Sequence, residues 1–264
     1  MKRVIFGLIA TFAFLTFFSC EKEDSNSSNT NLIENNSLLR KGDVTIINEN
    51  NVGYYHNEIL RFVFDDLNTM TSEEINTKIA TSNYTVLKMK EYCINNNLEL
   101  PSDEELNAQF INDKNTSLES LISNNIFSLE QKNILAECFN SLKLIDNDIT
   151  KNDLLVSILQ NNLDKVRLHS ESKGKTISIA IINQLIASDQ LWIVEDKINF
   201  LNQNNTFAKG VRPSNGQILA ADAKALGLSL IYGGWSPIGW AGSMFVGAGV
   251  SIGSYMGSPL WWPY

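Results

Sequence analysis

The stretch that decides the fold runs from Pro213 to Tyr264 and reads PSNGQILAADAKALGLSLIYGGWSPIGWAGSMFVGAGVSIGSYMGSPLWWPY. No charged side chain follows Lys224, so the later part of this stretch is apolar or weakly polar throughout. Pro237 follows the Gly233–Gly234 pair, and a proline without a backbone N–H next to two glycines interrupts a helix. The stretch therefore predicts two apolar helices that form a hairpin, over residues 217–232 and 238–257.

Glycines recur along the second helix of this hairpin at intervals of one or two helical turns. A helix face without side chains lets another backbone approach closely. We therefore predict that this face packs against a second helix, in a membrane or in a protein, and that it consists of Gly242, Gly249, Gly253 and Gly257.

Aromatic residues gather near the turn and the end of the hairpin. Tryptophan rings are typical of the headgroup level of a bilayer, which would make Trp235, Trp240, Trp261 and Trp262 interfacial residues. The alternative is a hairpin packed in a protein core, with the rings filling that core. The sequence leaves both open, because the first helix is short for a membrane span of about 20 residues and the second is long enough.

Gly249–Gly253 also matches the G-x-S-x-G pattern that carries the nucleophile of many hydrolases. That pattern needs an acid and then a histidine later in the chain, and neither follows Ser251. The only histidines are His56, which we expect at a surface or interface, and His169. We therefore assign no catalytic residue.

Gly174-Lys175-Thr176 resembles the end of a phosphate-binding loop, but His169 stands where such a loop needs glycine. We interpret this segment as a turn between helices with Thr176 as the N-cap, and we predict no nucleotide binding. The net charge of −8, without a basic cluster, argues against nucleic acid as a partner.

The remaining residue types that bind metals or form disulfides are few. No Cys-x-x-Cys pair, histidine pair at helical spacing or oxygen-rich loop occurs, so the sequence predicts no metal site. Cys93 and Cys138 lie in predicted helices, and they either form a disulfide or remain buried thiols.

The first residues indicate export. Lys2 and Arg3 precede an apolar run that is too short for a membrane span and right for a secretory signal. The run ends at Ser19-Cys20, which resembles a bacterial lipoprotein signal. This resemblance implies removal of residues 1–19 and acylation of Cys20, the only covalent cofactor that we expect.

The residues directly after Cys20 are charged, and Lys22, Glu23 and Asp24 resemble the export signal that carries Bacteroidota lipoproteins to the outer face of the outer membrane. Exposure on the cell exterior is thus expected, with a periplasm-facing lipoprotein as the alternative. Residues 20–52 are rich in Asn and Ser and predict a flexible tether.

Residues 53–212 predict an all-α domain, an irregular helical bundle that precedes the hairpin of residues 213–264. Apolar residues recur with a period of 3.6, and four capping boxes mark helix starts, namely Thr71 with Glu74, Ser102 with Glu105, Thr116 with Glu119, and Ser128 with Gln131. The expected helices are 54–68, 72–80, 83–97, 102–112, 117–125, 129–145, 151–169 and 176–202.

The helix over 176–202 is apolar on more than one face, so we expect it to be the central helix of the domain. Its β-branched segment, Ile177–Ile182, is compatible with a strand instead. Acids at the starts of the other helices fit the helix dipole and a solvated surface.

The order of parts resembles a group of Bacteroidota surface or secreted proteins. The residues that carry this resemblance are Cys20, the long helix around Ile179–Trp192, Ala221-Asp222-Ala223 and the glycine series between Gly233 and Gly257. The glycine-rich end is also similar to small membrane-active bacteriocins. These resemblances imply a non-enzymatic surface lipoprotein whose segment 217–257 contacts a membrane or a protein partner. The alternative functions are a surface-displayed membrane-permeabilising toxin and, third, an enzyme that acts on envelope polymers.

Overall fold

The computed structural model describes residues 46–71, 73–74, 84–196, 213–234 and 236–256. All regular elements among these residues are helices, so the all-α prediction is confirmed. The described residues belong to one compact unit, Lys41–Tyr264. The expected signal and export residues, including Cys20, Lys22, Glu23 and Asp24, lie outside the described residues, as does the expected tether up to residue 45. The last part of that tether is described, and Ile47 and Val52 are buried in the core, so the prediction of a flexible tether as far as residue 52 is wrong there.

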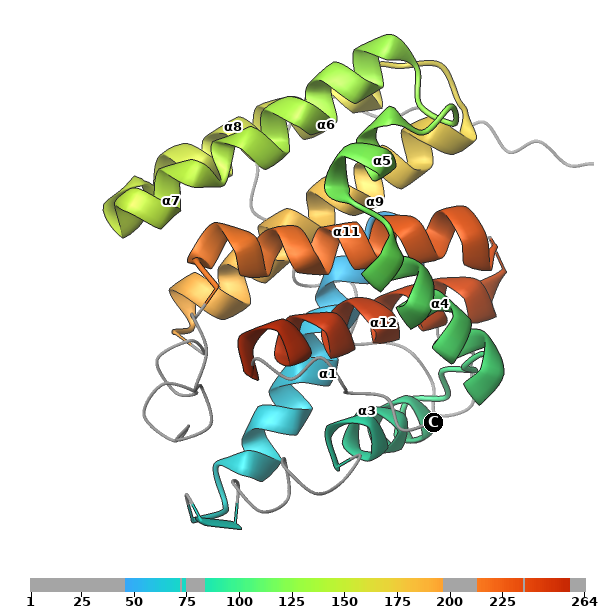
Figure 1. Cartoon of the computed structure of the whole chain (residues 1–264), viewed down its shortest axis with the longest axis vertical. Helices are drawn as coiled ribbons and strands as arrows, with labels where there is room; N and C mark the ends of the chain where they lie inside the picture. The colour runs from blue at the N-terminus through green and yellow to red at the C-terminus, as the bar shows by residue number, and fades with distance from the viewer. Residues whose placement is uncertain (1–45, 72, 75–83, 197–212, 235, 257–264) are drawn as a thin grey trace, which may run out of the picture. The chain divides into compact units, whose positions relative to one another are not determined.

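The helices are labelled as in Figure 1. Their bounds are α1 Val52–Leu67, α3 Tyr84–Asn95, α4 Asp103–Asn115, α5 Leu118–Ser123, α6 Leu129–Ser141, α7 Lys143–Asn147, η2 Ile149–Lys151, α8 Asn152–Arg167, α9 Lys173–Asp189, η3 Gln190–Val194, α11 Asn215–Gly233 and α12 Pro237–Met256.

Local hydrogen bonds explain where several helices begin. Ser102 and Glu105 form a complete capping box at α4, and Ser128 and Gln131 form one at α6. Thr71 and Glu74 also exchange the two bonds of a capping box. These three predictions are confirmed, and a further capping box, Ser214 with Gln217, opens α11.

Two predicted N-caps are wrong because a neighbouring hydroxyl takes the position. Ser117, and not Thr116, caps α5, and its Oγ accepts the Ser120 N–H. Ser172, and not Thr176, caps α9, whose first residue is Lys173. Thr176 is inside this helix, and its hydroxyl bonds back to the Ser172 carbonyl.

The central helix is shorter at its end than predicted. α9 stops at Asp189 and continues as one π-helical segment, η3, to Val194. The segment Ile177–Ile182 is helical, so the strand alternative is wrong. The predicted helix over 129–145 is two helices, α6 and α7, which meet at Leu142.

The hairpin of α11 and α12 is part of the core of the unit. The two helices pack on one another, α11 also packs on α9 and α4, and α12 packs on α1 (Figure 1). The boundary expected at residue 213 therefore separates no independent domain, since the same compact unit contains the helices on both sides of it. Packing into the core is the alternative that the described part of the hairpin adopts.

The strongest membrane-span candidate is another helix. Among the described residues, the helical stretch Lys173–Val194 has the length and hydropathy of a span, and 67% of the window that qualifies is buried inside the unit. A central helix covered by its neighbours needs this apolar composition in order to bury all of its faces. The prediction that this helix is central is thus consistent with its burial.

Candidate functional site

Asp222 is a fully buried carboxylate at the contact between α11 and α9. Its Oδ2 atom accepts two hydrogen bonds from the central helix, one from the Ser188 hydroxyl at 2.6 Å and one from the Trp192 indole N–H at 3.0 Å. Gln184, one turn before Ser188, donates to the Ser188 oxygen at 3.0 Å. A buried charge persists in a core when such donors surround it.

His56 of α1 approaches the other carboxylate oxygen, with its Nε2 atom 3.6 Å from Asp222 Oδ1. His56 is also fully buried, and its Nδ1 atom lies 3.1 Å from Asn57 Oδ1. Asn57 in turn donates to the Ala187 carbonyl of α9 at 2.7 Å. The expectation of a surface or interface position for His56 is therefore wrong, because three helices meet at this residue.

A glycine makes this meeting of helices possible. A Cβ atom on Gly53 would lie 2.7 Å from the Ala187 Cβ and 2.9 Å from the Asn183 carbonyl oxygen. Only a residue without a side chain lets α1 approach α9 this closely. The close approach brings the Asn57 amide within reach of α9 and places His56 beside Asp222.

Serine, histidine and an acid occur together here, but their order differs from that of a hydrolase. In a catalytic triad the imidazole lies between the hydroxyl and the acid, so that it can take the proton from the nucleophile. In this cluster the carboxylate lies between Ser188 and His56, which contact different oxygens of Asp222. All three side chains are fully buried. The arrangement joins α1, α9 and α11 and exposes no nucleophile to a substrate.

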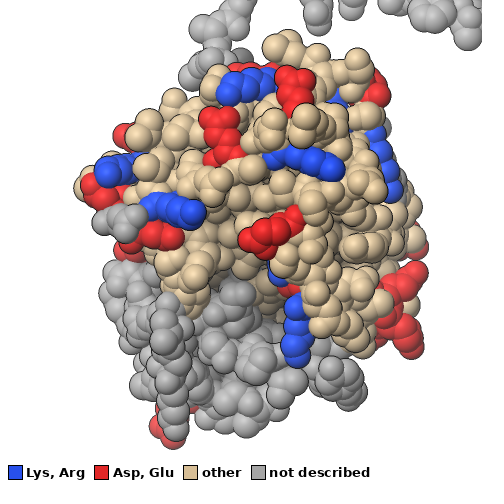
Figure 2. All heavy atoms as spheres, turned by 45° about the horizontal axis from the view of Figure 1, so that its top comes forward, with Lys and Arg blue, Asp and Glu red and all other residues tan. Residues whose placement is uncertain are grey.

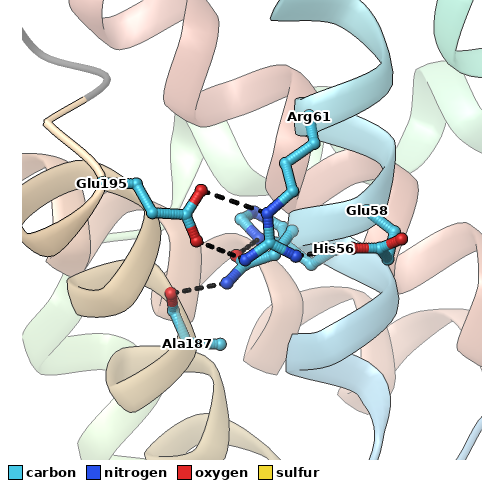
Figure 3. A network of polar contacts seen from close by, with 6 residues as sticks. His56, Glu58, Arg61, Ala187 and Glu195 are labelled. Carbon is cyan, nitrogen blue, oxygen red and sulfur yellow. Dashed lines mark hydrogen bonds and ion pairs between the residues drawn. The ribbon is translucent and has the colours of Figure 1, made fainter. Parts of the chain in front are cut away.

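A second polar network connects α1 to the end of the central helix. Figure 3 shows the Arg61 guanidinium between Glu195 and Glu58, with a two-pronged contact to Glu195. Arg61 Nη1 lies 2.5 Å from Glu58 Oε1. Hydrogen bonds to these two carboxylates raise the pKa of the Arg61 guanidinium. The side chains of these three residues are about a third exposed, so the network is an ion-pair link at the protein surface between α1 and the end of the central helix.

Lys224 forms a third polar connection, between α11 and the end of α4. Its Nζ atom donates to the Asp113 and Thr116 carbonyls at 2.9 and 3.2 Å, and it lies 3.2 Å from Asp113 Oδ1. Cations are favourable at a helix C-terminus, where carbonyl groups lack partners within the helix. Burial nevertheless raises the pKa of the Asp113 carboxyl, although Lys224 opposes this shift.

One groove lies where α4 passes the turn of the hairpin, and its volume is about 320 Å³. Side chains of α4 form one wall, and residues of the α11–α12 connection form the other. A second groove of about 520 Å³ lies over α6, α7 and α8, between Lys143, Lys151 and Glu137. It has an apolar floor that includes Leu144 and Ile158.

Charges on the surface are mixed. On the face shown in Figure 2, Lys and Arg side chains are interspersed with Asp and Glu side chains, and no patch of one sign dominates. Such a face offers no basic stripe for a nucleic acid. Within the described ranges, no group of three or more His, Cys, Asp or Glu side chains is placed to hold a metal ion.

The glycines of α12 differ in what they contact. A Cβ atom on Gly242 would lie 2.6 Å from Pro101 Cγ, and one on Gly249 would lie 2.8 Å from Phe110 Cζ. At these two predicted packing positions, the missing side chain makes room for Pro101, which precedes α4, and for Phe110 of α4. Neither position contacts the backbone of a second helix. Gly253 lies in α12 but outside the residues whose surroundings are described, and Gly257 lies outside the described residues altogether.

Only one of the predicted interfacial tryptophans is described, and it is buried. Trp240 is 6% exposed and belongs to the hydrophobic core, so its assignment to a bilayer interface is corrected. Trp235, Trp261 and Trp262 lie outside the described residues. The bilayer prediction assumed that the Trp240 ring lies between an apolar and a polar environment, whereas the surrounding helices cover this ring.

Cys93 and Cys138 are buried free thiols, so the disulfide alternative is wrong. Burial raises the pKa of both the Cys93 and the Cys138 thiol to about 12. A thiol that stays protonated is a poor nucleophile and a poor metal ligand. Both cysteines therefore act as small core residues.

The sequence did not identify His56 or Asp222 as partners, although it contained one signal. Asp222 and Lys224 are the only charged residues in an otherwise apolar helix, and a charge in such a helix needs a partner. The partner could not be read from the sequence, because His56 and Asp222 are far apart in the chain. Comparisons with protein-family models, with curated proteins and with solved structures find no match to this chain.

Proposed function

We propose that this protein is a non-enzymatic, lipid-anchored surface protein whose helical unit binds a partner outside the outer membrane. The anchor is an acyl group on Cys20, and residues 20–45 tether the unit to it. The observation that carries this proposal is the leader, in which a positive start and an apolar run end at Ser19-Cys20. Lys22, Glu23 and Asp24 directly after the cysteine support export to the cell exterior. A periplasm-facing anchor is the alternative.

The partner contact belongs on the outer faces of the unit in this proposal. The hairpin that we expected to contact a membrane or a partner is occupied by α9, α1 and α4. Removing it from these neighbours would expose Asp222, His56 and the apolar residues around them to an environment without their hydrogen-bond partners. Association through the lipid and an outer face leaves the hydrogen bonds of Asp222 and the apolar core intact.

Palmitate labelling of cells tests the anchor. The full chain should incorporate the label and sediment with membranes, and Cys20→Ala should lose both properties. Cys93→Ala is the matched control, because it removes a thiol that is buried in the unit and should leave labelling unchanged. A labelled, membrane-bound Cys20→Ala variant would show that the anchor assignment is wrong. Protease treatment of intact cells separates the exterior orientation, which is sensitive, from the periplasmic one, which is protected.

A membrane-permeabilising toxin is the second candidate, and one structural observation favours it. The apolar stretch Lys173–Val194 is long enough to span a bilayer and packs directly on the mostly apolar hairpin. A unit that opened could transfer these elements together into a membrane. Release of a dye from uncharged phosphatidylcholine vesicles tests this function. Our proposal expects no release above that of a vesicle-only control, and concentration-dependent release would favour the toxin.

The enzyme that acts on envelope polymers is the third candidate, and the described grooves give it little support. Glycoside cleavage requires two carboxyl groups that face one another across the scissile bond. Each of the two grooves described above is lined by a single acid, Glu105 in one and Glu137 in the other. We therefore do not assign this activity to either groove.

A further inference from the structure

The groove between α4 and the hairpin turn contains a polar group that lacks a partner. Gln109 lines this groove and is 6% exposed, and its Oε1 atom makes no hydrogen bond with the described residues. A buried amide oxygen without a partner destabilises a fold unless something binds it. A molecule in the groove would lie next to this amide.

The backbone of the turn is shaped around the same amide. Gly233 ends α11, and a Cβ atom there would lie 2.6 Å from Gln109 Nε2. Gly234 follows with a φ angle of 92°, a conformation that glycine adopts without strain. Ser236 directly precedes α12, and its Oγ accepts the Gly239 N–H at 3.1 Å. Because neither glycine has a side chain, neither covers the Gln109 amide.

The other polar residues of the groove are mostly neutral. Asn112 lies on the same face of α4 as Gln109, and the hydroxyl-bearing residues Ser236 and Tyr232 face them from the turn. None of the described residues that line the groove is Lys or Arg, so these residues do not suit an anion. The single acid, Glu105, is exposed and already accepts the Ser102 N–H at 2.9 Å, so a cation would find only one partly used carboxylate.

These properties match a ligand rich in hydroxyl groups. A hydroxyl both donates and accepts, so it can pair with either end of the Gln109 and Asn112 amides. Tyr232 is 55% exposed and offers a ring whose negative face attracts the weakly positive C–H groups of a sugar. A volume of about 320 Å³ is at the lower end of small-molecule sites. We propose that this groove binds one neutral sugar residue of a glycan.

Saturation-transfer difference NMR with D-glucose and N-acetyl-D-glucosamine tests this proposal. The full chain is kept in micelles of a detergent without a sugar headgroup, and each sugar is added to about 20 mM, above the millimolar affinity expected for one ring. We expect saturation transfer to at least one sugar. Ethanolamine and inorganic phosphate at the same concentration serve as cationic and anionic probes and should give no signal.

Variants connect the signal to the groove. Gln109→Leu replaces the amide by an apolar side chain of similar size, and Tyr232→Ala removes an exposed ring. Each should weaken sugar binding about fivefold or more, the loss of one hydrogen bond or one stacking contact. Gln160→Leu on the exposed side of α8 is the matched control and should bind normally.

Three outcomes would overturn the proposal. They are no transfer to either sugar, transfer to ethanolamine or phosphate in place of the sugars, and an unchanged sugar signal in both groove variants. Tyr232→Ala keeps the test valid if Gln109→Leu does not fold, because Tyr232 is on the surface. Sugar binding is independent of the acyl group on Cys20, so failure of one proposal does not decide the other.

Discussion

The Ser188 hydroxyl lies 2.6 Å from Asp222 Oδ2 and connects the central helix α9 to the first helix of the C-terminal hairpin. The Trp192 indole donates to the same oxygen, and the His56 imidazole lies 3.6 Å from the other. This carboxylate is therefore the point where α1, α9 and α11 are joined. Without this carboxylate, the Ser188 hydroxyl and the Trp192 indole N–H lose the acceptor that they share in the core.

Asp222→Ala should lower the free energy of unfolding by about 3–5 kcal/mol, because it removes from the core the acceptor that the Ser188 hydroxyl and the Trp192 indole N–H share. Urea unfolding followed by circular dichroism measures this change. Asp65→Ala is the matched control, since Asp65 lies on the exposed side of α1, and it should change stability by less than about 0.5 kcal/mol. Equal stability of the two variants would show that the cluster does not hold the helices together.

Two glycines of α12 allow a direct test of its packing. Gly242→Ala places a Cβ atom 2.6 Å from the rigid Pro101 ring and should destabilise the unit by about 1–3 kcal/mol. Gly247→Ala places one at an ordinary 3.5 Å from its nearest neighbour, and the better helix propensity of alanine should leave stability unchanged or raise it by up to about 1 kcal/mol. Thermal unfolding of both variants measures the difference. The packing described for α12 would be contradicted if Gly247→Ala were the more damaging substitution.

Both described thiols should be unreactive in the folded protein. A pKa of about 12 keeps Cys93 and Cys138 protonated at pH 8, and burial denies access to a reagent. In the Cys20→Ala background, Ellman's reagent should therefore detect no thiol before denaturant is added and both thiols afterwards. Adding Gln160→Cys to that background places one cysteine on the exposed side of α8, and this cysteine should react at once. Fast reaction of Cys93 or Cys138 without denaturant would contradict their burial.

Asp189 should make stability depend on pH between about 4 and 6. Burial raises the pKa of this carboxyl from 3.8 to about 6, although Asn152 Nδ2 donates to its Oδ2 atom at 3.1 Å. The folded state then binds more protons than the unfolded state in this window, so the contribution to stability falls as the pH rises through it. Above pH 6 the ionised carboxylate lowers stability by roughly 3 kcal/mol relative to its protonated form.

Asp189→Asn removes this ionisation. Asp189 Oδ1 and Asn152 Oδ1 both lack a partner among the described residues, and an amide at position 189 can donate to the Asn152 oxygen. We expect the variant to be more stable than the original by about 1–3 kcal/mol at pH 7.5 and nearly equal to it at pH 4. Urea unfolding at the two pH values measures both differences, with Asp65→Asn as an exposed control. A stabilisation of the same size at both pH values would exclude titration of Asp189 as its cause.

The sequence by itself determined the helical class and several helix starts, because those features depend on residues three or four positions apart. The capping boxes at Ser102 and Ser128 and the break before Pro237 are examples. The same local reasoning failed where two hydroxyls compete within a turn or two, as at Thr116 and Ser117. Both positions are compatible with a cap, and only the path of the chain after α4 selects one of them.

Only the tertiary structure decided which long-range partners these helices find. His56 and Asp222, Gly242 and Pro101, and the unpaired Gln109 amide beside Gly233 are brought together by the packing of whole helices. An apolar face shows that a helix is removed from water, but a protein core and a bilayer both provide such an environment. Composition alone therefore could not distinguish a hairpin packed in the core from one inserted into a membrane. The neighbours α1, α4 and α9 resolve this ambiguity, because they pack against the described part of the hairpin and provide the partners of its buried Asp222.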